Sequence, residues 1–210
     1  MALAITPTTL ETVTGRFVDL IDPDPKDICI EDIAWSLSRL ARFNGHTINK
    51  LPYSVAQHSL VVAYEAPRLA QEEIGYDRPL TMPEAARWRL LGLLHDASEA
   101  YTGDISGPLK KIPELRPIIK KIEHTIQDAI FKALGIAPPT ELEEKVVKQG
   151  DVLAQRIEAY NFMVSRGNGW SESPSVSIVK LQEFGMPMEH VDVYEEFLEM
   201  FKIESFNSLL

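Results

Sequence analysis

Apolar residues recur along most of the chain at the three- and four-residue spacing of helices that bury one face. This spacing predicts a first helix from Ile30 to near Asn44, and Ser54 is placed to cap a second one. Residues 84–101 form the most hydrophobic predicted helix. Three later segments show the same spacing: residues 118–134, 140–165 and 191–201. Because strand-like alternation is limited to a short piece around residues 16–18, the expected fold is all-α, a helical bundle.

Length and composition favour one ordinary globular domain over residues 1–210, with a core at about 30–165 and a helical extension at about 170–210. Cys29 is the single cysteine, so no disulfide framework is expected and a reducing, cytoplasmic setting fits. Residues 1–9 lack the positive start of a secretory signal, and no apolar stretch is long enough to span a bilayer. The formal charge of −10 opposes a nucleic-acid polymer as partner.

Three polar residues, His95, Asp96 and Glu99, close the apolar run of the central predicted helix. On a continuous helix Glu99 is four residues after His95, so all three face one side. A buried imidazole beside a buried carboxylate is costly unless another group compensates for it. We expect that group to be a divalent metal ion, with His58 from the preceding helix and Asp151 from a later one completing its ligands.

Two imidazoles and two carboxylates suit one divalent ion of borderline to hard character, which leaves Co, Mn, Zn, Ni, Fe and Mg open. Asp151 lies in a mainly apolar helical stretch, where an aspartate needs a partner. Asp128 is the alternative fourth ligand, although its predicted helix has a more ordinary solvated face. With such a set, a metal lowers the pKa of water and polarises a phosphoryl oxygen, which favours hydrolysis.

Two runs carry a resemblance to a known family: Tyr-Ser-Val-Ala-Gln-His-Ser at 53–59 and His-Asp-Ala-Ser-Glu-Ala-Tyr-Thr-Gly-Asp at 95–104. With Asp151 they resemble the signature of the HD-domain metal-dependent phosphohydrolases. Within that family the chain is most similar to the bacterial 5′-deoxynucleotidases and the phage dATP triphosphohydrolases. The resemblance covers roughly residues 33–165, and its second motif is long and specific. It implies the ligand set His58, His95, Asp96 and Asp151.

The same resemblance implies roles for further residues. Glu99 and Asp104 would be catalytic, managing protons and the orientation of the sugar, and an Asp104 near the 3′ side would disfavour a ribose 2′-hydroxyl. Arg42, Phe43 and Lys110 would bind the substrate, with the cations at the phosphate and Phe43 (or Tyr53) stacking on the base. Two alternatives for the phosphate contacts stay open: Arg39 for Arg42, and Lys111 for Lys110.

The expected activity is hydrolysis of 2′-deoxynucleotides at the 5′ phosphoester bond, releasing phosphate from a monophosphate or triphosphate from a triphosphate such as dATP. One alternative is an HD-type hydrolase of another nucleotide, such as guanosine tetraphosphate. The Gly-Tyr-Pro motif of the cyclic-dinucleotide branch is absent, and Ser98–Glu99 does not supply the Glu-Asp pair of the alarmone branch. The other alternative is a catalytically silent nucleotide sensor. By resemblance we also expect a homo-oligomer.

Overall fold

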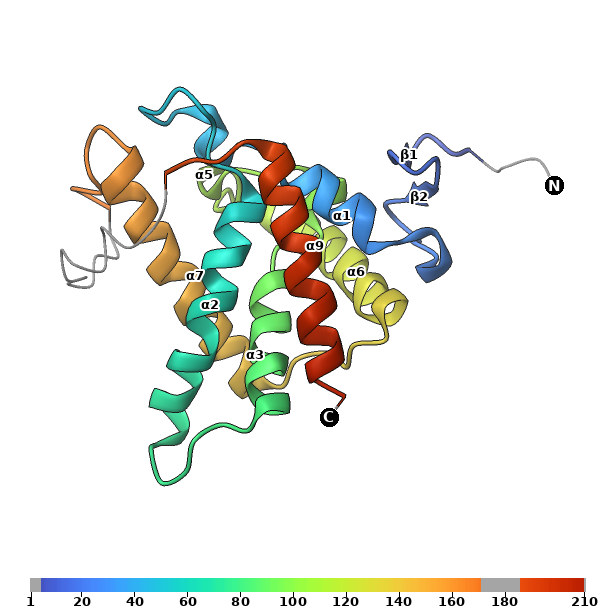
Figure 1. The fold of residues 1–210 in the computed structure, drawn as a ribbon. Helices are drawn as coiled ribbons and strands as arrows, with labels where there is room; N and C mark the ends of the chain where they lie inside the picture. Colours follow the sequence, from blue (N-terminus) through green and yellow to red (C-terminus); the bar gives the residue numbers. More distant parts are fainter. Residues whose placement is uncertain (1–4, 171–185, 210) are drawn as a thin grey trace.

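The computed structural model describes residues 5–170 and 186–209, and over these ranges it is mainly helical, which confirms the all-α prediction (Figure 1). The longer helices are α1 (Ile30–Leu37), α2 (Val55–Ile74), α3 (Met82–Leu94), α6 (Arg116–Leu134), α7 (Glu141–Phe162) and α9 (His190–Asn207). Two one-turn helices, α4 (Glu99–Thr102) and α5 (Gly107–Lys110), follow α3. A small antiparallel hairpin joins β1 (Thr9–Glu11) to β2 (Phe17–Asp19), where the sequence predicts a short strand.

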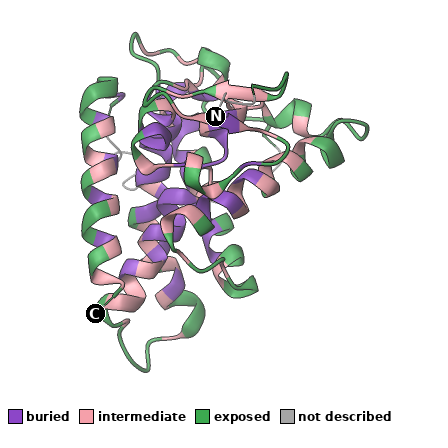
Figure 2. Ribbon diagram, turned by 90° about the vertical axis from the view of Figure 1, so that its right-hand side faces the viewer, coloured by how far each residue is buried: buried purple, intermediate pink, exposed green. Residues whose placement is uncertain are grey.

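Helix α2 lies between α3 and α7, and α9 packs against α3 and α1 (Figure 1). The apolar faces of these helices meet in a core of fully buried side chains that includes Ile33, Leu93, Ile130 and Phe197. Figure 2 shows the buried residues on the inward faces of the helices and the exposed ones outside. Of the predicted C-terminal extension, residues 171–185 lie outside the described residues. Across the described ranges, every helix is too short or too polar to cross a membrane.

Helix starts follow the predicted caps. The hydroxyl of Ser54 accepts from the backbone N–H of Gln57 and begins α2. Thr140 and Glu143 form the capping box expected at the start of α7, in which each side chain bonds to the backbone of the other. The two partners of each cap lie within one helical turn of each other in the sequence. Such caps can therefore be predicted from sequence alone.

The first predicted helix is too long. Helix α1 ends at Leu37 instead of near Asn44. The backbone N–H of Arg42 donates to the carbonyl of Tyr53 at 2.9 Å, so the chain after α1 runs beside the segment that leads into α2. Backbone groups committed to that pairing are not available for further helical turns. Because α1 ends early, Arg42 lies next to the start of α2, close to His58.

The central predicted helix is not continuous. Helix α3 ends at Leu94, a turn follows, and Glu99 starts α4. In an α-helix the N–H of Ser98 would donate to the carbonyl of Leu94. Here the side chain of Gln127, from α6, takes both groups: its Nε2 donates to the Leu94 carbonyl at 2.8 Å and its Oε1 accepts from the Ser98 N–H at 3.1 Å. An inserted side chain thus breaks the helix at His95.

Helices α2 and α3 approach each other closely at Gly92, one turn before His95. A Cβ added there would lie 2.8 Å from the Ala63 Cα and 2.9 Å from the Ala63 nitrogen, both backbone atoms that cannot move alone. We expect Gly92→Ala to lower the free energy of unfolding by about 1–3 kcal/mol, despite the helix propensity gained, which is roughly 1 kcal/mol. Urea unfolding of the variant and the parent protein measures this difference in the free energy of unfolding.

Gly150→Ala is the matched control for this prediction. Gly150 also faces α2, but an added Cβ would first meet side-chain atoms and not backbone, the Val62 Cγ1 at 3.3 Å and the Leu69 Cδ1 at 3.6 Å. This variant should be as stable as the parent protein or more stable. Equal stability of the two variants would show that the contact at Gly92 does not limit the approach of the two helices.

Candidate metal centre

The structure brings the four predicted ligands together from three helices. His58 lies in the first turn of α2, His95 and Asp96 directly follow α3, and Asp151 lies near the middle of α7. The Nε2 atom of His58 is 3.2 Å from both the His95 Nε2 and the Asp151 Oδ1. The Oδ2 atom of Asp96 is 3.2 Å from the His95 Nε2 and 3.7 Å from the His58 Nε2. We call these four residues the ligand cluster.

Hydrogen bonds to the other ring nitrogens fix which atom each histidine offers. The His58 Nδ1 lies 2.6 Å from the Glu158 Oε1, and the His95 Nδ1 lies 2.7 Å from the Gly92 carbonyl. A carboxylate and a carbonyl can only accept, so both Nδ1 atoms carry the hydrogen. Each ring therefore presents Nε2 to the other ligands, which is the tautomer that a metal ion requires.

The spacing of the His58, His95 and Asp151 ligand atoms fits one small divalent ion, and Asp96 approaches the two histidines of this group. Ligand atoms roughly 2.0–2.2 Å from an ion, at tetrahedral to octahedral angles, lie about 3 to 3.5 Å apart. The ligand atoms of His58, His95 and Asp151 all lie within 4.8 Å of one another. Burial and Arg42 lower the pKa of His58, but the carboxylates of Glu158 and Asp151 outweigh them and raise it to about 9. An ion would therefore replace a proton on Nε2.

Both aspartates of the ligand cluster are held as carboxylates. Burial raises the pKa of Asp96, but the neighbouring imidazoles of His95 and His58 bring it well below its usual range. The pKa of Asp151 is lowered in the same way, and the Lys148 ammonium contributes. The alternative ligand, Asp128, lies elsewhere: it is partly exposed on α6, with its Oδ2 3.7 Å from the His124 Nε2.

Arg42 is buried beside the ligand cluster. Its Nε donates to the Glu158 Oε2 at 2.9 Å, and its NH1 lies 3.9 Å from the Asp96 Oδ2. Its alternative, Arg39, is exposed, with its guanidinium 3.4 Å over the ring of Trp35. Glu158 is the functional candidate that sequence reasoning missed. The available signal was its position seven residues, or two helical turns, after Asp151, which places both on one face of α7.

A second ion pair joins the buried Glu99 to the partly exposed Lys110. The Lys110 Nζ is 2.9 Å from the Glu99 Oε1 and 2.9 Å from the Glu123 Oε1. The Glu99 Oε2 is buried without a hydrogen-bond partner, and burial, followed by the charge of Asp96, raises the pKa of Glu99 to about 8. Burial also raises the pKa of Asp104, against the opposing charges of Arg42 and Lys110. Lys111, the alternative to Lys110, is exposed.

The two aromatic candidates differ in their surroundings. Phe43 follows Arg42 with a backbone φ of 54°, in the left-handed region that costs energy for a non-glycine residue. Its partly exposed ring has a centroid 5.9 Å from that of Trp170. Tyr53 is buried, with its ring 4.7 Å from that of Phe162. Phe43 is therefore the candidate of the two that has surface to offer a ligand.

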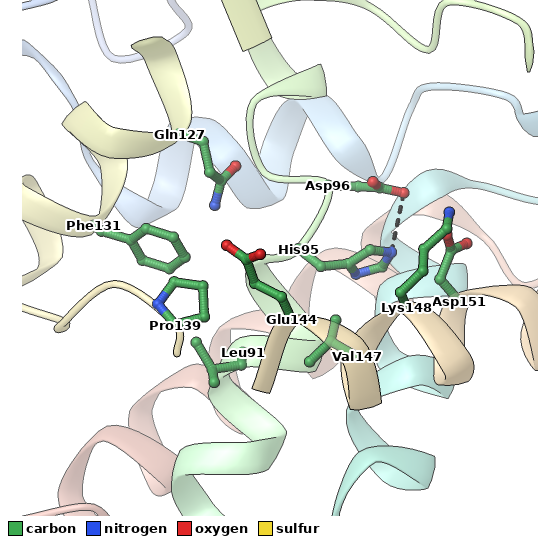
Figure 3. A pocket seen from close by; sticks show the side chains of 10 residues that line it. All are labelled: Leu91, His95, Asp96, Gln127, Phe131, Pro139, Glu144, Val147, Lys148 and Asp151. Atoms are coloured by element: carbon green, nitrogen blue, oxygen red, sulfur yellow. Dashed lines mark hydrogen bonds and ion pairs between the residues drawn. The ribbon is translucent and has the colours of Figure 1, made fainter. Parts of the chain in front are cut away.

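A cavity of about 300 Å³ opens beside the ligand cluster. In Figure 3, His95, Asp96 and Asp151 gather on one side of the view, and Leu91, Phe131 and Pro139 gather on the other. The Glu144 carboxylate lies between the two groups. A site with metal-binding side chains at one end and apolar side chains at the other suits a small molecule with a charged and an apolar part.

A His, His-Asp and Asp set gathered from three helices defines an HD-type domain, the class that the sequence motifs predict. The family model described as 5′-deoxynucleotidase YfbR-like matches residues 34–201, and the chain belongs to that family. The family is metal-dependent, and its match extends beyond the motifs into α9.

Similar curated proteins include two uncharacterized proteins and a 5′-deoxynucleotidase. An uncharacterized protein of Rhodobacter capsulatus is 36% identical over 149 residues, which cover 70% of this chain and 69% of that protein. The uncharacterized protein YfdR of Escherichia coli is 29% identical, over 91% of this chain and 93% of its own length. A 5′-deoxynucleotidase of Pasteurella multocida is 28% identical, over 70% and 79% respectively.

Proposed function

We propose that the protein is a metal-dependent hydrolase that releases phosphate from 2′-deoxynucleoside 5′-monophosphates. The observation that carries the proposal is the ligand cluster with a buried arginine, Arg42, beside it. A divalent ion held by His58, His95, Asp96 and Asp151 supplies a lowered water pKa and a polarised phosphoryl oxygen. The family match and the relatives named 5′-deoxynucleotidase support this substrate class.

The charges around the cluster favour a monophosphate over a triphosphate. Each of the three cations described at the site already has an acidic partner: Arg42 with Glu158, Lys110 with Glu99, and Lys148 with Asp151. A monophosphate brings a charge of about −1.5 to −2 at neutral pH, which matches the charge of one divalent ion. A triphosphate brings further negative charge beside Asp104 and Glu144, and the described site offers it no unpaired cation.

Arg42 and Glu99 have distinct tasks in this reaction. Arg42 is held by Glu158 with its NH1 toward Asp96, so it orients the phosphate next to the ligand cluster. Water adds to the phosphorus, and the bond from phosphorus to the 5′ oxygen breaks. The Glu99 Oε2, which lacks a hydrogen-bond partner, is available to carry the proton that the departing 5′ oxygen takes up. Lys110 keeps that carboxyl group in place.

Two surfaces near the ligand cluster are candidates for contact with the nucleoside half of the substrate. The cavity has an apolar wall of Leu91, Phe131 and Pro139, and its volume is at the lower end of the range for small-molecule pockets. Phe43 offers a partly exposed ring beside Arg42. Asp104 is the residue we assign to the deoxyribose, with a preference against the 2′-hydroxyl.

A substrate screen tests the proposed function. All deoxy- and ribonucleoside mono- and triphosphates are incubated with the protein and Co, Mn, Mg or Zn, and phosphate, pyrophosphate and triphosphate are separated. We expect phosphate from deoxynucleoside monophosphates, and none from a His95→Ala control. Faster release of triphosphate from dNTPs would replace the proposal with the triphosphohydrolase alternative. Tight nucleotide binding without any product would favour a sensor.

A further inference from the structure

Glu158, on α7, contacts both a proposed metal ligand, His58, and the proposed phosphate-binding residue, Arg42. Its carboxylate is 2% exposed, and each oxygen has its own partner: Oε1 is 2.6 Å from the His58 Nδ1, and Oε2 is 2.9 Å from the Arg42 Nε. We propose that Glu158 is a positioning residue that sets the metal ligand His58 and the phosphate-binding Arg42 relative to each other. This inference rests on the proposed function for its account of Arg42.

Glu158 controls both the protonation and the orientation of the His58 ring. The bond to Glu158 holds the hydrogen on Nδ1 and fixes the plane of the ring, so Nε2 stays directed at His95 and Asp151. A carboxylate behind a ligating imidazole also raises its basicity, which strengthens the bond to a metal. His58 is fully buried, so no water is available to replace this partner.

Glu158 also orients the guanidinium of Arg42. The guanidinium has donors on two edges, and Glu158 occupies Nε, the one nearest the backbone. The outer nitrogens remain on the side of the ligand cluster, where NH1 lies 3.9 Å from the Asp96 Oδ2. Because one rigid carboxylate accepts from both residues, a shift of either partner changes the distance between the metal site and the arginine.

This arrangement requires a carboxylate and not merely a polar side chain. The partners His58 and Arg42 both donate, so the residue between them has to accept twice. Glutamine has the same shape but offers one oxygen and one NH₂ group. In Glu158→Gln, one of the two donors would therefore face another donor inside a buried site, where the mismatch is costly. Glu158→Asp keeps the charge but is one methylene shorter, so it reaches one partner at the expense of the other.

The test compares Glu158→Gln with Glu204→Gln. Glu204 is also a buried carboxylate, 8% exposed, but it lies on α9 with its Oε1 3.4 Å from Arg89 and outside the ligand cluster. Titration calorimetry with Mn²⁺ or Co²⁺ alone measures metal affinity, and kcat and KM are then measured for the monophosphate substrate at saturating metal. For Glu158→Gln we expect metal affinity to fall about 10–100-fold and KM to rise. Glu204→Gln should match the parent protein in both.

The outcomes separate this inference from the proposed function. If the parent protein hydrolyses no deoxynucleotide while Glu158→Gln still loses metal affinity, the function is wrong and the link to His58 stands. If the parent protein is active and the folded variant keeps its metal affinity and KM, the positioning role is wrong, and the buried pair is only structural. Circular dichroism checks folding. Should Glu158→Gln not fold, Glu158→Asp takes its place, with the same loss expected and the same unchanged result overturning the inference.

Discussion

Asp151→Asn is expected to remove most of the activity and most of the metal affinity. The asparagine side chain has the size of aspartate but no charge, and Asp151 Oδ1 is 3.2 Å from the His58 Nε2 in the ligand cluster. Loss of residues that only support metal ligands costs about 10–100-fold, so loss of a ligand should cost at least about 100-fold. Calorimetry with Mn²⁺ and phosphate release from deoxynucleoside monophosphates measure the two effects.

Asp128→Asn is the control for this prediction because Asp128 is the alternative ligand from sequence. It is partly exposed on α6 and pairs with the exposed His124, one turn away on the same helix. The variant should keep the metal affinity and the activity of the parent protein, since an exposed pair of this kind contributes less than about 1 kcal/mol. If Asp128→Asn lost metal and Asp151→Asn did not, the assignment of the fourth ligand would be reversed.

The features of the fold that follow from sequence are those with local causes. The caps at Ser54 and at Thr140–Glu143 act within one turn, and helical spacing located each long described helix. The break after α3 has a distant cause. It depends on Gln127, whose side chain takes the Leu94 carbonyl and the Ser98 N–H from 33 and 29 residues away. The spacing of apolar residues predicts which face of a segment is buried, but it does not predict a contact from a side chain on a distant helix.

The residues of the site likewise fall into those that sequence motifs indicate and those that only distant contacts bring together. The ligand cluster could be proposed from sequence because His95, Asp96 and Asp151 lie in apolar helical surroundings, where such residues are unusual. The resemblance, which rests on long motifs, adds His58 to them.

Glu158 was not proposed from sequence, although it is nearly as buried as His58. In the sequence it is one of many glutamates on helices, and solvated glutamates are the common case. Its position two turns after Asp151 indicates a shared helix face, and the approach of the segment after α1, which brings Arg42 to α7, shows that Glu158 faces inward.

Arg42→Ala is expected to affect both stability and substrate binding. Arg42 is buried, and its removal leaves the Glu158 carboxylate without its partner, 2.9 Å away. Breaking a buried ion pair in this way costs about 3–5 kcal/mol, which urea unfolding measures. At saturating metal, KM for the monophosphate should also rise, because the guanidinium is the buried cation beside the ligand cluster. Arg39→Ala removes an exposed arginine stacked on Trp35 and should change both quantities little.

Arg42→Lys separates the two effects. A lysine restores the positive charge next to Glu158, so part of the lost stability should return. Its ammonium is a single point, however, and lacks the planar fork with which arginine bonds Glu158 through Nε while presenting its outer nitrogens toward Asp96. KM should therefore remain raised. Recovery of both quantities would mean that charge alone suffices at this position, and a raised KM in Arg39→Ala with a normal one in Arg42→Ala would move the phosphate contact to Arg39.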